Sequence, residues 1–188
     1  MDRNRFLRDS MRSFVALFAA IKVPSALRAE EPQDVPCAES LKKVEGERDF
    51  IDNWVTDLLD TMDQQLDEKT RIRLMEGCGR GCYLRHQFKQ DIAAKGCGSL
   101  EKLIKAYDEN FEIWREGDTV HIRYGKVSKK CYCPVVRNRH PGGKDLHCEC
   151  TRGTHQTIFE TALGRPVPVE VLESVRRGGV TCHFLAHV

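Results

Sequence analysis

The sequence predicts an α+β fold in which N-terminal helices pack with a small antiparallel sheet, one further helix and a closing C-terminal hairpin. Apolar residues recur at helical spacing before residue 110 and alternate with polar ones after it. Helical spacing returns once, over residues 150–163, before alternating segments continue to the C-terminus. A block of helices followed mainly by strands is typical of α+β domains.

Residues 37 to about 110 are predicted to be helical. The first helix has an apolar face that includes Trp54 and Leu58, and further helices are expected over residues 67–75 and 83–94. Ser99 is the predicted N-cap of a helix over residues 100–107, because a serine hydroxyl can accept a bond from a free backbone N–H. We expect the Trp54 and Leu58 face to pack against the strand that contains residues 167–171.

Three strand regions follow the helices. Residues 111–115 and 119–124 alternate around Glu116, Gly117 and Asp118, which predicts a hairpin. Residues 131–136 are expected to form a short strand. After the helix over residues 150–163, which Gly164 should end, a closing hairpin is predicted from residues 167–174 and 180–188.

The first 29 residues have the order of an export signal. Four arginines precede an apolar run over residues 14–21, and a small-residue site at residues 26–29 follows. The run is shorter than the ~20 apolar residues that cross a bilayer, so no stable membrane span is expected. The segment Arg3-Asn4-Arg5-Phe6-Leu7 resembles the twin-arginine motif, except that Asn4 replaces the second arginine. We therefore expect cleavage of residues 1–29 and a periplasmic or otherwise exported protein.

Residues 30–188 are predicted to form a single cysteine-rich domain. The signal segment contains six Arg or Lys and two Asp, so removing its +4 from the whole-chain charge of +2 leaves about −2. This balance does not predict a nucleic-acid partner. A small molecule is the expected partner, and a homo-oligomer stays open.

Seven of the nine cysteines are spaced like metal ligands. Short cysteine pairs provide two thiolates from one segment, which suits a tetrahedral soft metal such as zinc. Export would also permit disulfides, although an odd number of cysteines cannot all pair within one chain. An iron–sulfur cluster is a further alternative, without its usual C-x2-C spacing. The candidate ligands are Cys78, Cys82, Cys131, Cys133, Cys148, Cys150 and Cys182.

Cys78 and Cys82 lie in a glycine-rich segment. If this segment is helical, residues four apart share a face and both sulfurs can reach one ion. A disulfide or buried thiols in a turn are the structural alternatives. A phosphate-binding loop is not expected, because no Gly-Lys-Ser/Thr sequence follows.

The last 60 residues resemble the 4-vinyl-reductase domain family and the aminothiazoline-carboxylate-hydrolase-like proteins. The resemblance rests on Cys150 at a helix start, on the Leu-Gly-Arg-Pro-Val strand entry, on Glu173, and on the final Gly-Val-Thr-Cys182-His-Phe. It implies a small-molecule-binding domain in which zinc connects the helix to the last hairpin. By position it implies Cys150, Glu173 and Cys182 as ligands.

This chain departs from the family pattern at Arg176, where the family has a cysteine. A guanidinium cannot ligate zinc, so another donor would have to complete the site. Cys148 or the pair Cys131 and Cys133 are the candidates.

Candidate acid and base residues are few. His155 is the only candidate general base, and Glu173 is a weak second candidate beside a metal-bound water. We therefore carry three hypotheses: a zinc domain that binds or senses a small molecule, a metal-dependent hydrolase, and a thiol redox or metal-carrier protein.

Overall fold

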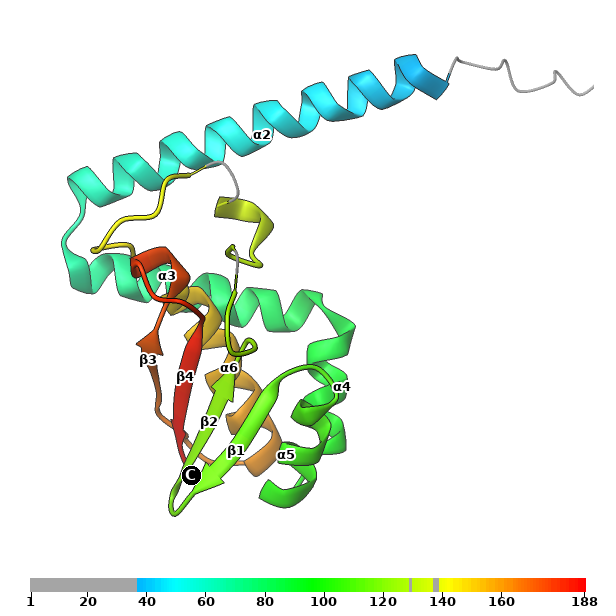
Figure 1. Cartoon of the computed structure of the whole chain (residues 1–188), viewed down its shortest axis with the longest axis vertical. Coiled ribbons are helices and arrows are strands. Elements are labelled where there is room, and N and C mark those ends of the chain that lie inside the picture. Colours follow the sequence, from blue (N-terminus) through cyan, green and yellow to red (C-terminus); the bar gives the residue numbers. More distant parts are fainter. Residues whose placement is uncertain (1–36, 129, 137–138) are drawn as a thin grey trace, which may run out of the picture. The chain divides into compact units, whose positions relative to one another are not determined.

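The computed structural model describes residues 37–128, 130–136 and 139–188, and its fold is α+β, as predicted (Figure 1). The predicted export signal lies outside the described residues. Residues 44–188 form one compact unit, and residues up to Lys43 belong to another. All contacts given below lie within the unit of residues 44–188.

The N-terminal half is helical, as expected. Helix α2 spans Cys37–Gln65, α3 Glu68–Arg85, α4 Gln87–Lys95 and α5 Leu100–Asp108. The Asp67 side chain accepts a hydrogen bond from the backbone N–H of Thr70 and begins α3. Ser99 accepts one from the backbone N–H of Lys102, which confirms it as the N-cap of α5.

The sheet has four antiparallel strands in the order β1-β2-β4-β3. Strands β1 (Glu112–Glu116) and β2 (Thr119–Arg123) form the first predicted hairpin, with Gly117 at positive φ in the turn. The closing hairpin is also confirmed, because β3 (Val169–Glu173) pairs with β4 (His183–His187). A short 3-10 helix, η2 (Val175–Arg177), follows β3.

Helices cover one face of this sheet. Helix α6 spans Cys148–Leu163 and ends at Gly164 in the left-handed conformation, as predicted. In Figure 1 it runs behind the sheet, and Phe159 from α6 packs with Phe184 from β4 in the main core. Because side chains of α4 and α5 enter the same core, the N-terminal helices and the C-terminal half are parts of one hydrophobic unit.

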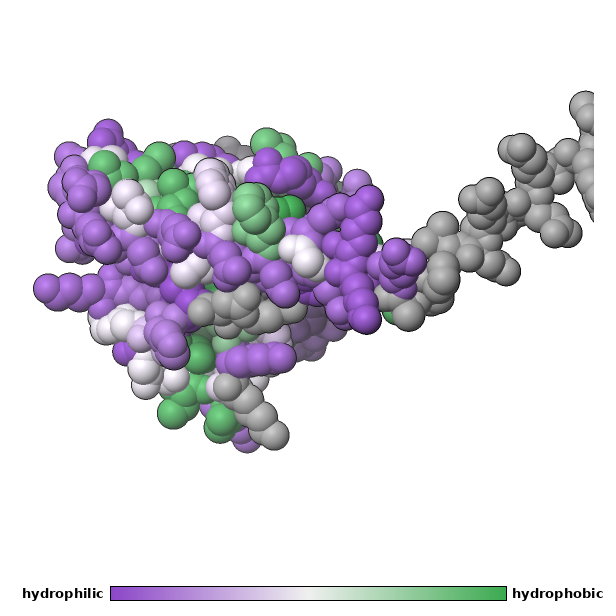
Figure 2. Space-filling model, turned by 90° about the horizontal axis from the view of Figure 1, so that it is seen from above, coloured by the Kyte–Doolittle hydropathy of each residue, from purple (hydrophilic) through white to green (hydrophobic). Residues whose placement is uncertain are grey.

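The predicted packing of α2 on the strand at 167–171 is wrong. Trp54 is 58% exposed and Leu58 is 43% exposed. Leu59 of α2 is buried instead, and it forms a second small core with Met75 and Val136. Apolar residues occupy a wide arc of α2, and the periodicity does not tell which part of that arc is buried. Figure 2, a view from above, shows apolar patches among the hydrophilic residues of the surface.

The predicted strand at 131–136 is also absent from the described residues. Residues 134–136 form a 3-10 helix instead, η1 (Pro134–Val136). Proline lacks a backbone N–H and has a fixed φ, so it fits the first position of a helical turn better than a sheet. Cys131 and Cys133 therefore lie in an irregular segment that packs against the second core.

Among the described residues, no helix is both long and apolar enough to cross a bilayer.

Candidate metal centre

The crossing of α3 and α6 rests on two glycines. A Cβ atom placed on Gly79 would lie 2.2 Å from the carbonyl oxygen of Cys150, and one on Gly153 would lie 3.1 Å from the Cα of Glu76. The Thr154 hydroxyl donates to the carbonyl of Gly79 at 3.0 Å. This close approach brings the α3 segment with Cys78 and Cys82 beside the first turns of α6.

Cys148 and Cys150 leave α6 on different sides, because residues two apart in a helix are about 200° apart around its axis. Cys148 is buried, its sulfur lies 2.8 Å from Ser174 Oγ, and it shares a hydrogen bond with Cys182. This bond raises the pKa of Cys148, with burial adding to it, and lowers the pKa of Cys182. The first turn of α6 is thus joined to the segment that precedes β4.

Cys150 lies in the other part of the cluster. Burial raises its pKa to about 12, and the nearby thiols of Cys133, Cys78 and Cys82 add to this effect. The Lys89 ammonium lies 2.8 Å from Cys82 Sγ. Burial raises the pKa values of Cys131 and Cys133, and electrostatic repulsion from the Cys148 thiol raises both further. Through these electrostatic interactions and the Cys148–Cys182 hydrogen bond, the seven candidate cysteines are linked in one region of the fold, which we call the thiol cluster.

His147 completes this cluster on the loop side. Its Nε2 atom lies 3.2 Å from Cys133 Sγ, and the residue is only 6% exposed. Its backbone N–H donates to Asp145 Oδ1 at 2.8 Å. The chain direction at the start of α6 therefore places the imidazole beside the loop thiol.

The donor types in the cluster fit a zinc ion, since zinc is bound by thiolates and imidazoles in tetrahedral sites. The eight cysteines whose side chains are described are free thiols. As they stand, no three described His, Cys, Asp or Glu side chains form a group that could hold a metal ion. Coordination would therefore require the cysteine side chains to move from these positions, for example by a change of rotamer.

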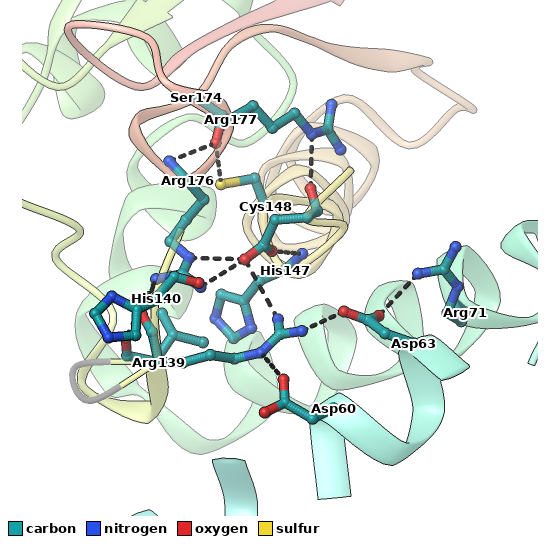
Figure 3. A network of polar contacts seen from close by, with 12 residues as sticks. Asp60, Asp63, Arg71, Arg139, His140, His147, Cys148, Ser174, Arg176 and Arg177 are labelled. Atoms are coloured by element: carbon teal, nitrogen blue, oxygen red, sulfur yellow. Dashed lines mark hydrogen bonds and ion pairs between the residues drawn. The ribbon is translucent and has the colours of Figure 1, made fainter. Parts of the chain in front are cut away.

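Arg176 holds the loop that precedes α6. Its guanidinium donates to Asp145 Oδ2 at 2.6 and 2.9 Å and to the carbonyl oxygens of Val136, Arg139 and His140 (Figure 3). Arg176 is 3% exposed and Asp145 is 4% exposed, so this is a buried, charge-assisted contact. Arg176 thus fixes the loop that follows Cys131 and Cys133.

The network continues from Arg139 to α2. Arg139 contacts Asp145 and pairs with Asp60 and Asp63, and Asp63 also accepts a bond from Arg71 at 2.8 Å. Figure 3 shows this chain of alternating charges, which leads from Arg176 to α2 and α3. Because it spans three segments, it fixes the position of the loop relative to the helices.

Glu173 serves the turn between β3 and β4. Its Oε1 accepts backbone N–H bonds from Val180 at 2.7 Å and Thr181 at 3.4 Å. The structure thus gives Glu173 a turn-stabilising contact, and its proposed role as a ligand or acid stays a prediction.

His155 lies in the main core between two tyrosines. Tyr107 Oη is 3.1 Å from Nδ1, and Tyr124 Oη is 3.1 Å from Nε2. Burial lowers the pKa of His155 to about 3, so the ring is neutral at physiological pH. Both ring nitrogens have tyrosine partners, which leaves its proposed role as a general base without support from the contacts.

Sequence reasoning missed several residues of the site. For His147, the only indication in the sequence of a role in the site was its position directly before Cys148. Lys89 and Ser174 carry no motif, and the function of Arg176 depends on a carboxylate 31 residues away. These contacts depend on how the loop folds back, which local sequence patterns do not encode.

Two surface hollows adjoin the network on the side of α3. One has a volume of about 400 Å³ and the other about 340 Å³, and Arg71 and Lys144 line both. Arg177, in the larger one, pairs with Glu149 at 2.8 Å. Lys144 has no ion-pair partner among the described residues. Carboxylates also line both hollows and pair with Arg71, Arg139 and Arg177, so of the described Lys and Arg side chains in these walls Lys144 is left for an anionic ligand.

Comparison with known proteins gave one family. The model of DUF6144, a family of unknown function, matches residues 15–186. No curated protein and no solved structure matches the chain.

Proposed function

The chain belongs to DUF6144, a family of unknown function, and we propose that it is an exported domain whose cysteines bind zinc. In this proposal the ion connects α3, the loop at 131–133 and the start of α6, while the Cys148–Cys182 hydrogen bond joins this region to the segment before β4. The domain binds or senses a small molecule beside that centre.

The convergence of the cysteines carries the proposal. Four pieces of chain that lie far apart in sequence bring their thiols to one region, around Cys148 and Cys150 at the start of α6. Buried cysteines that serve only as small apolar residues have no reason to gather in this way. Cys97, which is exposed in a turn away from the cluster, is a useful comparison.

The small-molecule part of the proposal is supported by the two hollows beside the charge network. Lys144, which lines both and has no described ion-pair partner, favours a ligand with a carboxylate or similar anionic group. The loop with Gly142 and Gly143 borders them, and Arg176 connects this loop to the thiol cluster.

A thiol redox function is the second candidate, because of the contact between Cys148 and Cys182. Exchange with a partner disulfide would form an S–S bond between these two residues and release the partner as two thiols. The partner would take up both electrons and both protons. Both sulfurs are buried, so this exchange requires local opening.

A chelation experiment tests the zinc proposal. The purified full chain is treated with a strong chelator, and the melting temperature, the zinc released to an indicator and the number of reactive thiols are measured. We expect zinc release, more reactive thiols and a lower melting temperature, since metal binding energy is also folding energy. A chelator that changes none of these would contradict the proposal, and Cys97→Ser is the control that should behave like the parent.

A further inference from the structure

His147 has no structural role that explains its position. It stands at the N-cap position of α6, yet its side chain makes no capping hydrogen bond. The ring is buried with the residue 6% exposed, and its one described polar contact is Nε2 to Cys133 Sγ at 3.2 Å. The role of a capping or surface histidine is therefore excluded.

The other ring nitrogen is buried without a partner. Nδ1 of His147 and Nε of Arg71 are the two buried side-chain nitrogen or oxygen atoms without a hydrogen bond in the described part of the chain. Both residues line a void of about 10 Å³, together with Asp63. A void of this size, with polar atoms on its walls, holds one water molecule.

We propose, building on the zinc centre proposed above, that His147 is a ligand of that centre through Nε2 and shares the ion with Cys133. A water in the small void bonds to Nδ1 and connects it to Asp63. Sequence spacing did not assign this histidine to the centre.

The distance supports the pairing. Typical Zn–S and Zn–N bonds of about 2.3 and 2.0–2.1 Å, at a tetrahedral angle, separate two ligand atoms by roughly 3.5 Å. The observed 3.2 Å is close to this separation. A small rotation of the Cys133 side chain would open the space between the two atoms for the ion.

The unpaired Nδ1 atom of His147 supports a ring orientation in which Nε2 binds the ion. When Nε2 binds a metal, the proton of the neutral imidazole is on Nδ1, and that N–H usually donates to a carboxylate, a carbonyl or a water. The void beside Asp63 has room for such a water. Asp63 in turn is paired with Arg71 and Arg139, so the acceptor side is held in place.

The neighbouring thiols give the rest of the ligand set. The sulfur of Cys148 lies 2.8 Å from Ser174 Oγ, so it is engaged elsewhere, whereas Cys82 and Cys150 interact electrostatically with the Cys133 thiol. Three thiolates and one imidazole form a closed structural zinc site. We therefore place His147 and Cys133 on the ion, and Cys82 and Cys150 are the candidates for the other two ligands.

X-ray absorption at the zinc edge of the purified full chain tests this assignment. We expect a shell of sulfur atoms with one nitrogen, and the outer-shell scattering of an imidazole ring. A shell of sulfur alone would overturn the inference while leaving the zinc proposal intact. A protein without any bound metal would overturn both, so the two failures are distinguishable.

Two variants sharpen the test. His147→Gln should lose the imidazole scattering, change the visible spectrum of the cobalt-substituted protein and weaken zinc binding. The loss should exceed the roughly 10–100-fold that removal of a ligand's hydrogen-bond partner costs. The matched control is His140→Gln, an exposed histidine of the same loop, which should keep the parent spectrum and affinity. An unchanged cobalt spectrum in His147→Gln would overturn the inference.

Discussion

At the scale of single residues, Arg176 anchors the loop that precedes α6. The guanidinium bonds one carboxylate and three backbone carbonyl groups, so it connects η2 to the loop before α6. A buried charge of this kind is stable only when its partners are complete. The resemblance predicts a missing ligand at this position, and the structure shows a loop anchor instead.

Replacing this arginine should therefore destabilise the fold. Arg176→Met leaves Asp145 buried with Arg139 as its one other cation in the described part of the chain, and removing one partner of a buried pair costs about 3–5 kcal/mol. We expect the lower end of this range, because Arg139 remains. Urea unfolding measures the effect, and Arg165→Met, at an exposed position, is the control. Equal unfolding curves for Arg176→Met and the parent would contradict this role.

His155 makes stability depend on pH. Its pKa is about 3 in the folded state, because burial disfavours the charged ring, and about 6.5 in an unfolded chain. Between these values the unfolded state binds a proton that the folded state does not, so stability falls as pH falls through this window.

We expect this histidine to contribute a loss of about 1.4 kcal/mol for each pH unit below 6.5. Urea unfolding at pH 7, 6 and 5 measures the slope. His155→Gln, whose amide can still bond both tyrosines, should show a smaller slope, while His140→Gln should keep the parent slope. If His155→Gln and the parent lose stability in parallel, the histidine does not have the assigned pKa.

At the scale of elements, the sequence patterns predicted local structure well. Ser99 begins α5 and Gly164 ends α6 because a cap needs a specific side chain or backbone conformation at one position. The segment 131–136 was predicted wrongly as a strand, because Pro134 fits the first position of a helical turn better than a sheet. The exposed face of α2 was also assigned wrongly, because periodicity defines a face without defining its partner.

The crossing of α3 and α6 gives a prediction with a matched control. In Gly79→Ala the new methyl group meets the backbone of Cys150 at 2.2 Å, so the helices must separate. We expect a loss of about 1–3 kcal/mol, typical of overpacking, together with weaker zinc binding. Thermal unfolding and a zinc titration measure both effects.

Gly77→Ala is the control on the same helix, because a Cβ there meets nothing within 4 Å. Alanine favours a helix interior by roughly 0.5–1 kcal/mol over glycine, so this variant should be as stable as the parent or more stable. If both variants behave alike, the tight crossing does not position the cysteines.

At the scale of the whole molecule, the sequence predicted the α+β class, but not the different directions in which Cys148 and Cys150 leave α6. The spacing suggested that Cys148 and Cys150 act together, whereas the helix turns them to different sides. The surroundings of both cysteines depend on contacts between residues that are distant in sequence. The backbone of Cys150 packs against Gly79, and the sulfur of Cys148 contacts the hydroxyl of Ser174. The charge network that orders the loop depends on contacts of the same kind.

The central claim is that the thiol cluster is a metal centre, and elemental analysis of the purified full chain tests it most directly. We predict zinc in a stoichiometric amount, retained in Cys97→Ser and lost in Cys133→Ser and Cys150→Ser, with lower melting temperatures for the latter two. Iron with sulfide would instead identify an iron–sulfur cluster. A parent protein without bound metal, or cysteine variants with the full metal content of the parent, would contradict the account.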